Sequence, residues 1–183
     1  MRRGLDTPLQ LEVVLMDAGL LLARVVFGTL MAAHGSQKLF GWFGGYGLTG
    51  TAGFFETLGF RPGRLFAFAA AATEIASGLL LALGLLQPVA AALMLSVMIV
   101  AAGSVHWQHG LFASTNGIEV PLLYGVVAAA LALTGPGAYS LDRAFGVDVL
   151  WTPAVTVTLL ALGVLGGLAN LTLRRTAAQT ATA

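Results

Sequence analysis

The sequence predicts an all-α membrane protein, and three observations support this fold class. Of the 183 residues, 57% are hydrophobic and only 9% are charged, whereas soluble domains carry roughly 25% charged residues. Five apolar stretches, each bounded by Gly, Pro or charged residues, are long enough to cross a bilayer. Because only helices and closed barrels satisfy every backbone polar group in lipid, each stretch is predicted to be a helix.

The composition also excludes several functions. The formal net charge is +1, so the chain lacks the basic field that nucleic-acid binding needs. There is no cysteine, which excludes disulfides, thiolate nucleophiles, Cys-ligated zinc and iron–sulfur clusters. A redox role would therefore need a bound quinone, haem or flavin, or a redox partner.

The first span is predicted at about residues 16–38, after a polar lead-in at 1–15. Asp6-Thr7-Pro8 resembles a helix start, with a capping side chain and a proline in the first turn. Arg24 interrupts the apolar run, which is also too long for the core of a signal peptide. We expect a retained anchor rather than a cleaved signal.

The polar residues of this span lie mostly on one stripe. Asp17, Arg24, Met31 and Lys38 recur every seven positions and therefore share one helical face. Charges are costly against lipid, so this face is expected to point into the bundle. His34 lies four residues before Lys38, which allows both side chains to face one ligand.

A Gly- and aromatic-rich stretch follows, and it allows two interpretations. The segment from His34 to Gly47 is typical either of an aromatic belt with a flexible loop or of a binding site. We expect the interfacial or re-entrant loop at 41–64 to fold back on the bundle, because it carries too many aromatic rings for a free loop. These rings belong to Phe40, Phe43, Phe54, Phe55 and Phe60.

The second span, at about 65–86, carries one charge, Glu74, near its middle. Ala67, Ala71 and Gly78 lie near the same face as Glu74, and such small residues let another helix approach closely. The remaining predicted segments are a third span at about 89–105, a fourth from Asn116 to Thr134, a polar loop at 139–150, a fifth span at about 152–173 and a disordered tail at 176–183.

Orientation follows from the basic residues at the span ends. With five spans and an outer N-terminus, Lys38, Arg61, Arg64, Arg174 and Arg175 lie inside, and Arg2, Arg3 and Arg143 lie outside. Five basic residues on the inner side against three on the outer side favour this orientation. If Lys38 belongs to a buried site, the count becomes four against three.

Four motifs, in this order, resemble the DoxX family of small bacterial membrane proteins. They are Ala23-Arg24-Val25-Val26-Phe27-Gly28, His34-Gly35-Ser36-Gln37-Lys38-Leu39-Phe40-Gly41, Thr73-Glu74 with Gly78, and Gly135-Pro136-Gly137-Ala138-Tyr139-Ser140-Leu141-Asp142. The resemblance covers about residues 24–146. It implies a four-helix transmembrane bundle at 16–146, with an additional C-terminal transmembrane helix at 147–175.

The resemblance also implies a location and a range of functions. The family takes its name from a subunit of a thiosulfate:quinone oxidoreductase, and other members are linked to quinone or catechol detoxification or to redox complexes. It therefore implies a multi-pass protein of the bacterial cytoplasmic (inner) membrane. No catalytic residue set carries over, and the candidate ligand-binding positions are Arg24, His34, Lys38 and Glu74.

Arg24 and Glu74 are predicted to pair. Each is a charge deep in an apolar span, and sequential spans in a hairpin are neighbours. The pair is either an ion pair that fixes helix register or part of a substrate or proton site.

The other polar positions allow similar alternatives. Lys38 and His34 would suit a quinone carbonyl or an anion, or would simply stabilise a helix C-terminus. His106 and His109 lack carboxylate companions, which disfavours metal or haem ligation. Glu119 is interpreted as a first-turn carboxylate rather than an acid catalyst.

Three functions fit these observations. The first is a redox-linked membrane subunit that binds a quinone-like apolar ligand or a redox protein partner; as an enzyme it would be a subunit of a quinone-linked oxidoreductase. The second is a non-catalytic scaffold or assembly factor. The third is a small transporter, which at this length would need to form a homo-oligomer. Membrane lipid is the expected surrounding of each.

Overall fold

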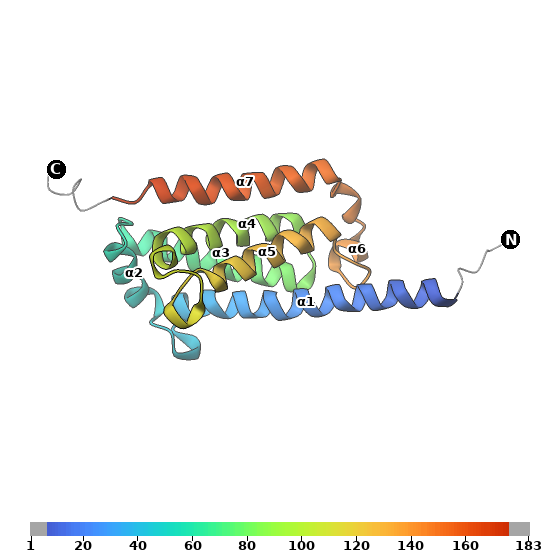
Figure 1. Cartoon of the computed structure of the whole chain (residues 1–183), viewed down its shortest axis with the longest axis horizontal. Coiled ribbons are helices and arrows are strands. Elements are labelled where there is room, and N and C mark those ends of the chain that lie inside the picture. Colours follow the sequence, from blue (N-terminus) through green and yellow to red (C-terminus); the bar gives the residue numbers. More distant parts are fainter. Residues whose placement is uncertain (1–6, 176–183) are drawn as a thin grey trace.

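The computed structural model describes residues 7–175, and all regular structure in this range is helical. Five long helices run alternately up and down the bundle (Figure 1): α1 (Thr7–Phe40), α3 (Gly63–Leu83), α4 (Gln87–Ala101), α5 (Glu119–Thr134) and α7 (Pro153–Thr172). Two shorter helices lie at opposite ends, α2 (Gly47–Thr57) at one and α6 (Leu141–Phe145) at the other. A π-helical turn, Ala102–His106, extends α4, and single 3-10 turns cover Trp42–Gly44, Trp107–His109, Ala113–Thr115 and Asp148–Leu150.

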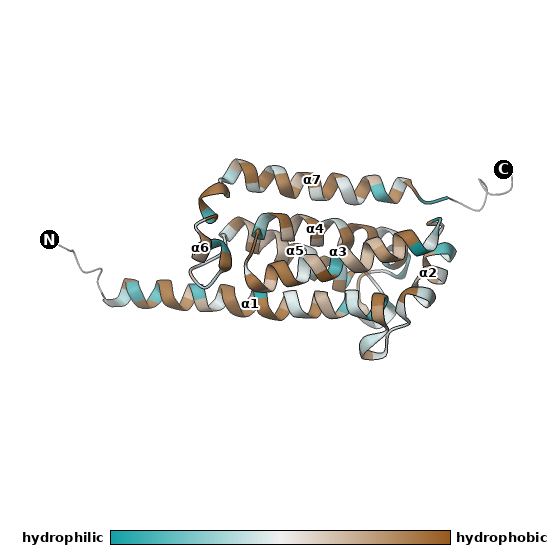
Figure 2. Cartoon of the chain, turned by 180° about the vertical axis from the view of Figure 1, so that it is seen from behind, coloured by the Kyte–Doolittle hydropathy of each residue, from teal (hydrophilic) through white to brown (hydrophobic). Residues whose placement is uncertain are grey.

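Four of these helical segments are long and apolar enough to cross a membrane. They are Pro8–Phe40, Gly63–Leu83, Gln87–His109 and Pro153–Thr172, whereas α5 is apolar but shorter. Apolar residues predominate along the long helices in Figure 2. The prediction of an all-helical protein with membrane-spanning segments is confirmed, with four candidate spans among the described residues.

Glycines set the contact between α1 and α3. A Cβ atom on Gly28 would lie 2.5 Å from the Gly78 carbonyl oxygen, and one on Gly35 would lie 2.6 Å from the Ala71 carbonyl oxygen. The two backbones therefore touch, as small residues at helix interfaces allow. The predicted small-residue face of α3 is confirmed, since Ala67, Ala71, Glu74 and Gly78 are all buried.

The C-terminal helix α7 attaches to α4 in the same way. A Cβ atom on Gly163 would lie 2.5 Å from the Ala92 carbonyl oxygen, and one on Gly167 would lie 2.8 Å from the Ser96 carbonyl oxygen. The segment that the sequence suggested as an addition, 147–175, is thus packed closely against the rest of the bundle.

The core lies where α1, α3, α4 and α5 meet. Met31, Leu81 and Met94 are fully buried there, and Tyr124 from α5 packs among them. The predicted inward stripe of α1 is also confirmed: Asp17, Arg24 and Met31 are buried, and Lys38 is half-buried.

The loop at 41–64 folds back on the bundle, as predicted, and most of it is helical. Helix α2 packs against α3 and α1, and Phe60 is only 1% exposed, with its ring centroid 5.2 Å from that of Phe66. The expectation that these rings would be covered was wrong for Phe40, Phe43 and Phe54, which are exposed. At Phe43 the backbone alone folds back, because Gln37 Nε2 donates to the Phe43 carbonyl at 3.1 Å.

The ends of the chain differ from the prediction in one respect. Helix α1 already begins at Thr7, so most of the lead-in predicted at 1–15 is helical, and its first turns extend beyond the other helices (Figure 1). Thr7-Pro8 is the predicted helix start. The predicted disordered tail, 176–183, lies outside the described residues.

Candidate functional site

An ion pair joins the last turns of α1 to the middle of α3. Lys38 Nζ lies 2.6 Å from Glu74 Oε2. The Glu74 side chain is only 4% exposed and that of Lys38 is 30% exposed. The buried Glu74 carboxylate therefore holds the Lys38 ammonium group in place, while the Lys38 side chain stays partly exposed.

The predicted pair of Arg24 with Glu74 was wrong, and helix register is the reason. The glycine contacts place Gly28 opposite the turn between Gly78 and Ala82, and Gly35 opposite the turn between Ala71 and Ile75. By this register Glu74 lies at about the level of residue 34, which is ten residues, or about 15 Å, along α1 from Arg24. Lys38 lies one turn beyond that level and reaches back to Glu74.

Arg24 lies instead at the end of the bundle that carries α6. Its side chain is fully buried, and Nη2 donates to the Tyr139 carbonyl oxygen at 2.5 Å. Its Nε and Nη1 have no hydrogen-bond partner among the described residues, and the carboxylates of Asp142 and Asp17 lie at the same end of the bundle. The guanidinium group covers Gly84 so closely that a Cβ atom there would overlap Nη1.

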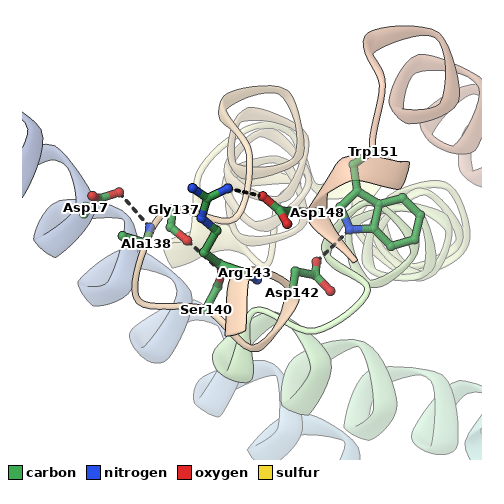
Figure 3. Close-up of polar contacts among 8 residues, drawn as sticks. All are labelled: Asp17, Gly137, Ala138, Ser140, Asp142, Arg143, Asp148 and Trp151. Carbon is green, nitrogen blue, oxygen red and sulfur yellow. Dashed lines mark hydrogen bonds and ion pairs between the residues drawn. The ribbon is translucent and has the colours of Figure 1, made fainter. Parts of the chain in front are cut away.

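The motif at 135–142 ties three distant segments together at this end. Asp142 accepts hydrogen bonds from the backbone amides of Leu86 (2.7 Å) and Gln87 (2.9 Å), and from Trp151 Nε1 (2.9 Å). It thereby caps the N-terminus of α4 from more than fifty residues away. Asp17 Oδ1 accepts from the Ala138 amide at 2.9 Å (Figure 3). These bonds show that the polar loop at 139–150 and the motif before it connect α1, the start of α4 and Trp151.

Three of the four predicted site residues gather nearer the end that carries α2. His34 is one turn from Lys38, and its ring packs edge-on against Tyr124, with centroids 5.9 Å apart. Tyr124 was not predicted as a site residue, because a Tyr in an apolar helix is typical of an interfacial belt; its burial identifies it as a core residue.

A cavity of about 590 Å³ opens beside this cluster. It lies between the C-terminus of α1, the Trp42–Gly44 turn and α2, and is lined by Gln37, Lys38, Gly44, Gly45, Tyr46, Gly50, Thr51, Phe54 and Phe55. Lys38 is the one charged residue of this lining. Arg24, His34 and Glu74 do not line it. The structure therefore brings one predicted ligand-binding residue, Lys38, to the cavity wall and a second, Glu74, into contact with it, whereas His34 is exposed.

The remaining polar candidates have local partners. His106 Nδ1 lies 2.7 Å from the Asn116 carbonyl oxygen, and His109 Nδ1 lies 2.9 Å from that of Val105. No group of three or more potential metal ligands occurs between residues 7 and 175. Glu119 accepts a hydrogen bond from the Ala113 amide at 2.7 Å, in the first turn of α5, which confirms its structural interpretation.

Comparison with known proteins gives one match. The family model described as DoxX matches residues 19–107. None of the curated proteins and none of the solved structures compared with the chain matches it. The matched segment contains Arg24, His34, Lys38 and Glu74, and it ends before α5 begins.

Proposed function

We propose, on the premise that this chain belongs to the DoxX family through residues 19–107, that it binds a quinone-like apolar ring beside Lys38 as a redox-linked membrane subunit. One observation carries this proposal: a buried carboxylate holds an ammonium group at the wall of an aromatic-lined cavity. Ligand sites commonly combine an apolar lining with a few placed polar groups.

The cavity suits such a ligand in size and in chemistry. Its volume of about 590 Å³ falls within the roughly 300–1,000 Å³ of small-molecule sites. Phe54, Phe55 and Tyr46 offer aromatic surface to a flat ring, and Lys38 offers an N–H donor to a ring carbonyl. The positive charge of Lys38 would favour the electron-rich form of that ring.

Glu74 acts through Lys38 in this proposal. Because Glu74 is buried and bonded to Nζ, it fixes where the ammonium group points and offsets part of its charge. The chain has no cysteine, so electrons would pass between the bound ring and a redox protein partner. In an enzyme, this chain would be a subunit of a quinone-linked oxidoreductase.

The location that fits this function is a bacterial inner membrane crossed five times, with α5 and α7 both spanning. Arg61 and Arg64 lie at the start of α3, and Arg174 follows α7 and donates to the Leu58 carbonyl, so all three are at the end of the bundle that carries α2. Arg143 belongs to α6, which lies at the opposite end (Figure 1). The excess of basic residues favours a cytoplasmic position for the α2 end. The proposed site then faces the compartment that holds soluble redox partners.

A scaffold function is the second candidate, and a separate observation favours it. Trp42, Phe43 and Tyr46 follow one another closely in the turn after α1, and Tyr46 is 88% exposed. Exposed aromatic residues are typical of protein contact sites as well as of membrane interfaces. A partner that docks there would cover the mouth of the same cavity.

Ligand binding can be tested directly in nanodiscs. We expect a short-tailed benzoquinone to bind the wild-type protein and to quench its tryptophan fluorescence. Lys38→Met should weaken binding about tenfold or more, because a hydrogen bond from a charged group contributes about 1.5–3 kcal/mol. Arg64→Met is the matched control, since Arg64 is an exposed cation near the same end and does not line the cavity. No binding to the wild type, or equal binding by both variants, would refute the site.

A further inference from the structure

A second cavity, of about 290 Å³, lies at the opposite end of the bundle. The N-termini of α4 and α7 and the C-terminus of α5 surround it, so it lies where these helices begin or end. Gln87, Asp148, Trp151 and Thr156 contribute to its lining, together with three prolines. It is separate from the cavity beside Lys38 and shares no lining residue with it.

Gln87 lines this cavity and carries an unpaired, buried acceptor. The residue is fully buried, and its Nε2 donates to the carbonyl oxygens of Leu131 (2.5 Å) and Gly135 (2.9 Å). Exchanging the amide oxygen and nitrogen would set Oε1 against two carbonyl oxygens, so this orientation is fixed. Oε1 has no hydrogen-bond partner among the described residues. A buried acceptor without a donor is costly, so a donor is expected to reach it.

Among the other polar side chains of the lining, Asp148 can only accept, and the Thr156 hydroxyl can accept as well as donate. Asp148 carries a carboxylate, of which Oδ2 is bonded to Arg143 Nη1 at 2.7 Å. The indole N–H of Trp151 is already used by Asp142. The lining therefore calls for a ligand that donates several hydrogen bonds, and the carboxylate favours one with a positive charge.

We propose that this cavity binds the headgroup of an ethanolamine phospholipid. Its primary ammonium group has three N–H donors and a positive charge, which match Gln87 Oε1 and the Asp148 carboxylate. Arg143 lies at the edge with an exposed guanidinium group that can pair with the lipid phosphate. The ends of the apolar helices lie at the depth of the lipid headgroups, and the cavity lies at these ends. A lipid of the adjacent leaflet can therefore place its headgroup in the cavity.

Lipids that differ only in the headgroup amine test this proposal. The purified, delipidated full chain would be mixed with phosphatidylethanolamine, its mono- and dimethyl forms, and phosphatidylcholine, and lipid retention measured by native mass spectrometry. Phosphatidylcholine keeps the phosphate and the charge but has no N–H donor. We expect retention to fall with each methyl group, and at least fivefold between the first and the last lipid. Equal retention of these two lipids would overturn the proposal.

Two variants locate the effect in the cavity. Asp148→Asn keeps an acceptor for Arg143 but removes the charge, and Thr156→Val changes the wall without changing side-chain size. Both should lose most of the preference for the ethanolamine lipid while melting within a few degrees of the wild type. Glu12→Gln removes an exposed carboxylate from the start of α1 and should keep the preference. An unchanged preference in Asp148→Asn would overturn the proposal, as would binding of free O-phosphoethanolamine without lipid retention.

Discussion

Removing either partner of the Lys38–Glu74 pair should destabilise the protein, but by unequal amounts. Lys38→Met leaves the Glu74 carboxylate without its counter-ion, with its side chain only 4% exposed. Orphaning one member of a buried pair typically costs about 3–5 kcal/mol. Glu74→Gln leaves Lys38 unpaired, but its side chain is 30% exposed and can reach solvent through the cavity. We expect a loss of about 1 kcal/mol for that variant, close to the value of an exposed pair.

The double variant separates the effect of losing the ion pair from the cost of leaving one buried charge unpaired. Lys38→Met with Glu74→Gln orphans no charge, so it should be more stable than Lys38→Met alone. At roughly 2–4 °C per kcal/mol for a chain of this size, Lys38→Met should lower the melting temperature by about 6–20 °C. Melting in one detergent at one protein concentration measures all three variants.

A double-mutant cycle between Arg24 and Glu74 serves as the control. Arg24 and Glu74 are about 15 Å apart along the α1–α3 interface, so Arg24→Met and Glu74→Gln should have additive effects. Equal losses from the two single variants at Lys38 and Glu74, or additivity between them, would refute the argument from burial. Coupling between Arg24 and Glu74 would show that the helix register is wrong.

Two further substitutions test the contacts of Arg24 and Asp142 at the α6 end, both by melting in detergent. Gly84→Ala places a Cβ atom on Arg24 Nη1 at a residue in the left-handed helical region, with φ +63°. The backbone strain alone costs about 1–2 kcal/mol, so we expect a loss above 2 kcal/mol. Gly146→Ala, in the same backbone region with φ +70° but with open space around it, should cost only the strain. Asp142→Asn removes a negative charge at the end that holds Arg24 and one acceptor of the α4 cap, so it should cost about 2–4 kcal/mol. The control variant Asp148→Asn should cost well under 1 kcal/mol. Equal losses of stability at the two aspartates would contradict the capping role of Asp142.

The helices could be predicted from the sequence because their causes are local. Each predicted span lies within a few residues of an observed helix, apart from the early start of α1, since apolar length and flanking Gly or Pro set those limits. The inward stripe of α1 and the small-residue face of α3 follow from helical periodicity in the same way. The sequence also named Lys38 among four candidate ligand-binding residues, and the structure places it at a cavity near the end of α1.

The partners of the charges could not be predicted, because their causes are not local. The pairing of Glu74 with Lys38 depends on helix register, which is set by Gly28 against Gly78 and by the path of the chain through α2. The link from Asp142 to the start of α4 spans more than fifty residues and follows no periodicity. The motif at 135–142 was visible as a motif, but its role required the fold.

The predicted ligand-binding residues at the two ends of the bundle differ in how they are bonded, and this difference indicates which of them can act on a quinone-like ring. At the α6 end, Asp17, Arg24 and Asp142 are each bonded to the backbone of another segment, so they hold the fold together, and Arg24 is fully buried. These bonds also join the family-matched segment to residues beyond it, because Arg24 and the start of α4 depend on Tyr139 and Asp142. At the α2 end, Lys38 is bonded to a side chain and lines a cavity of about 590 Å³. A group held in place but still accessible can act on a ligand, and this favours Lys38 over the more deeply buried Arg24.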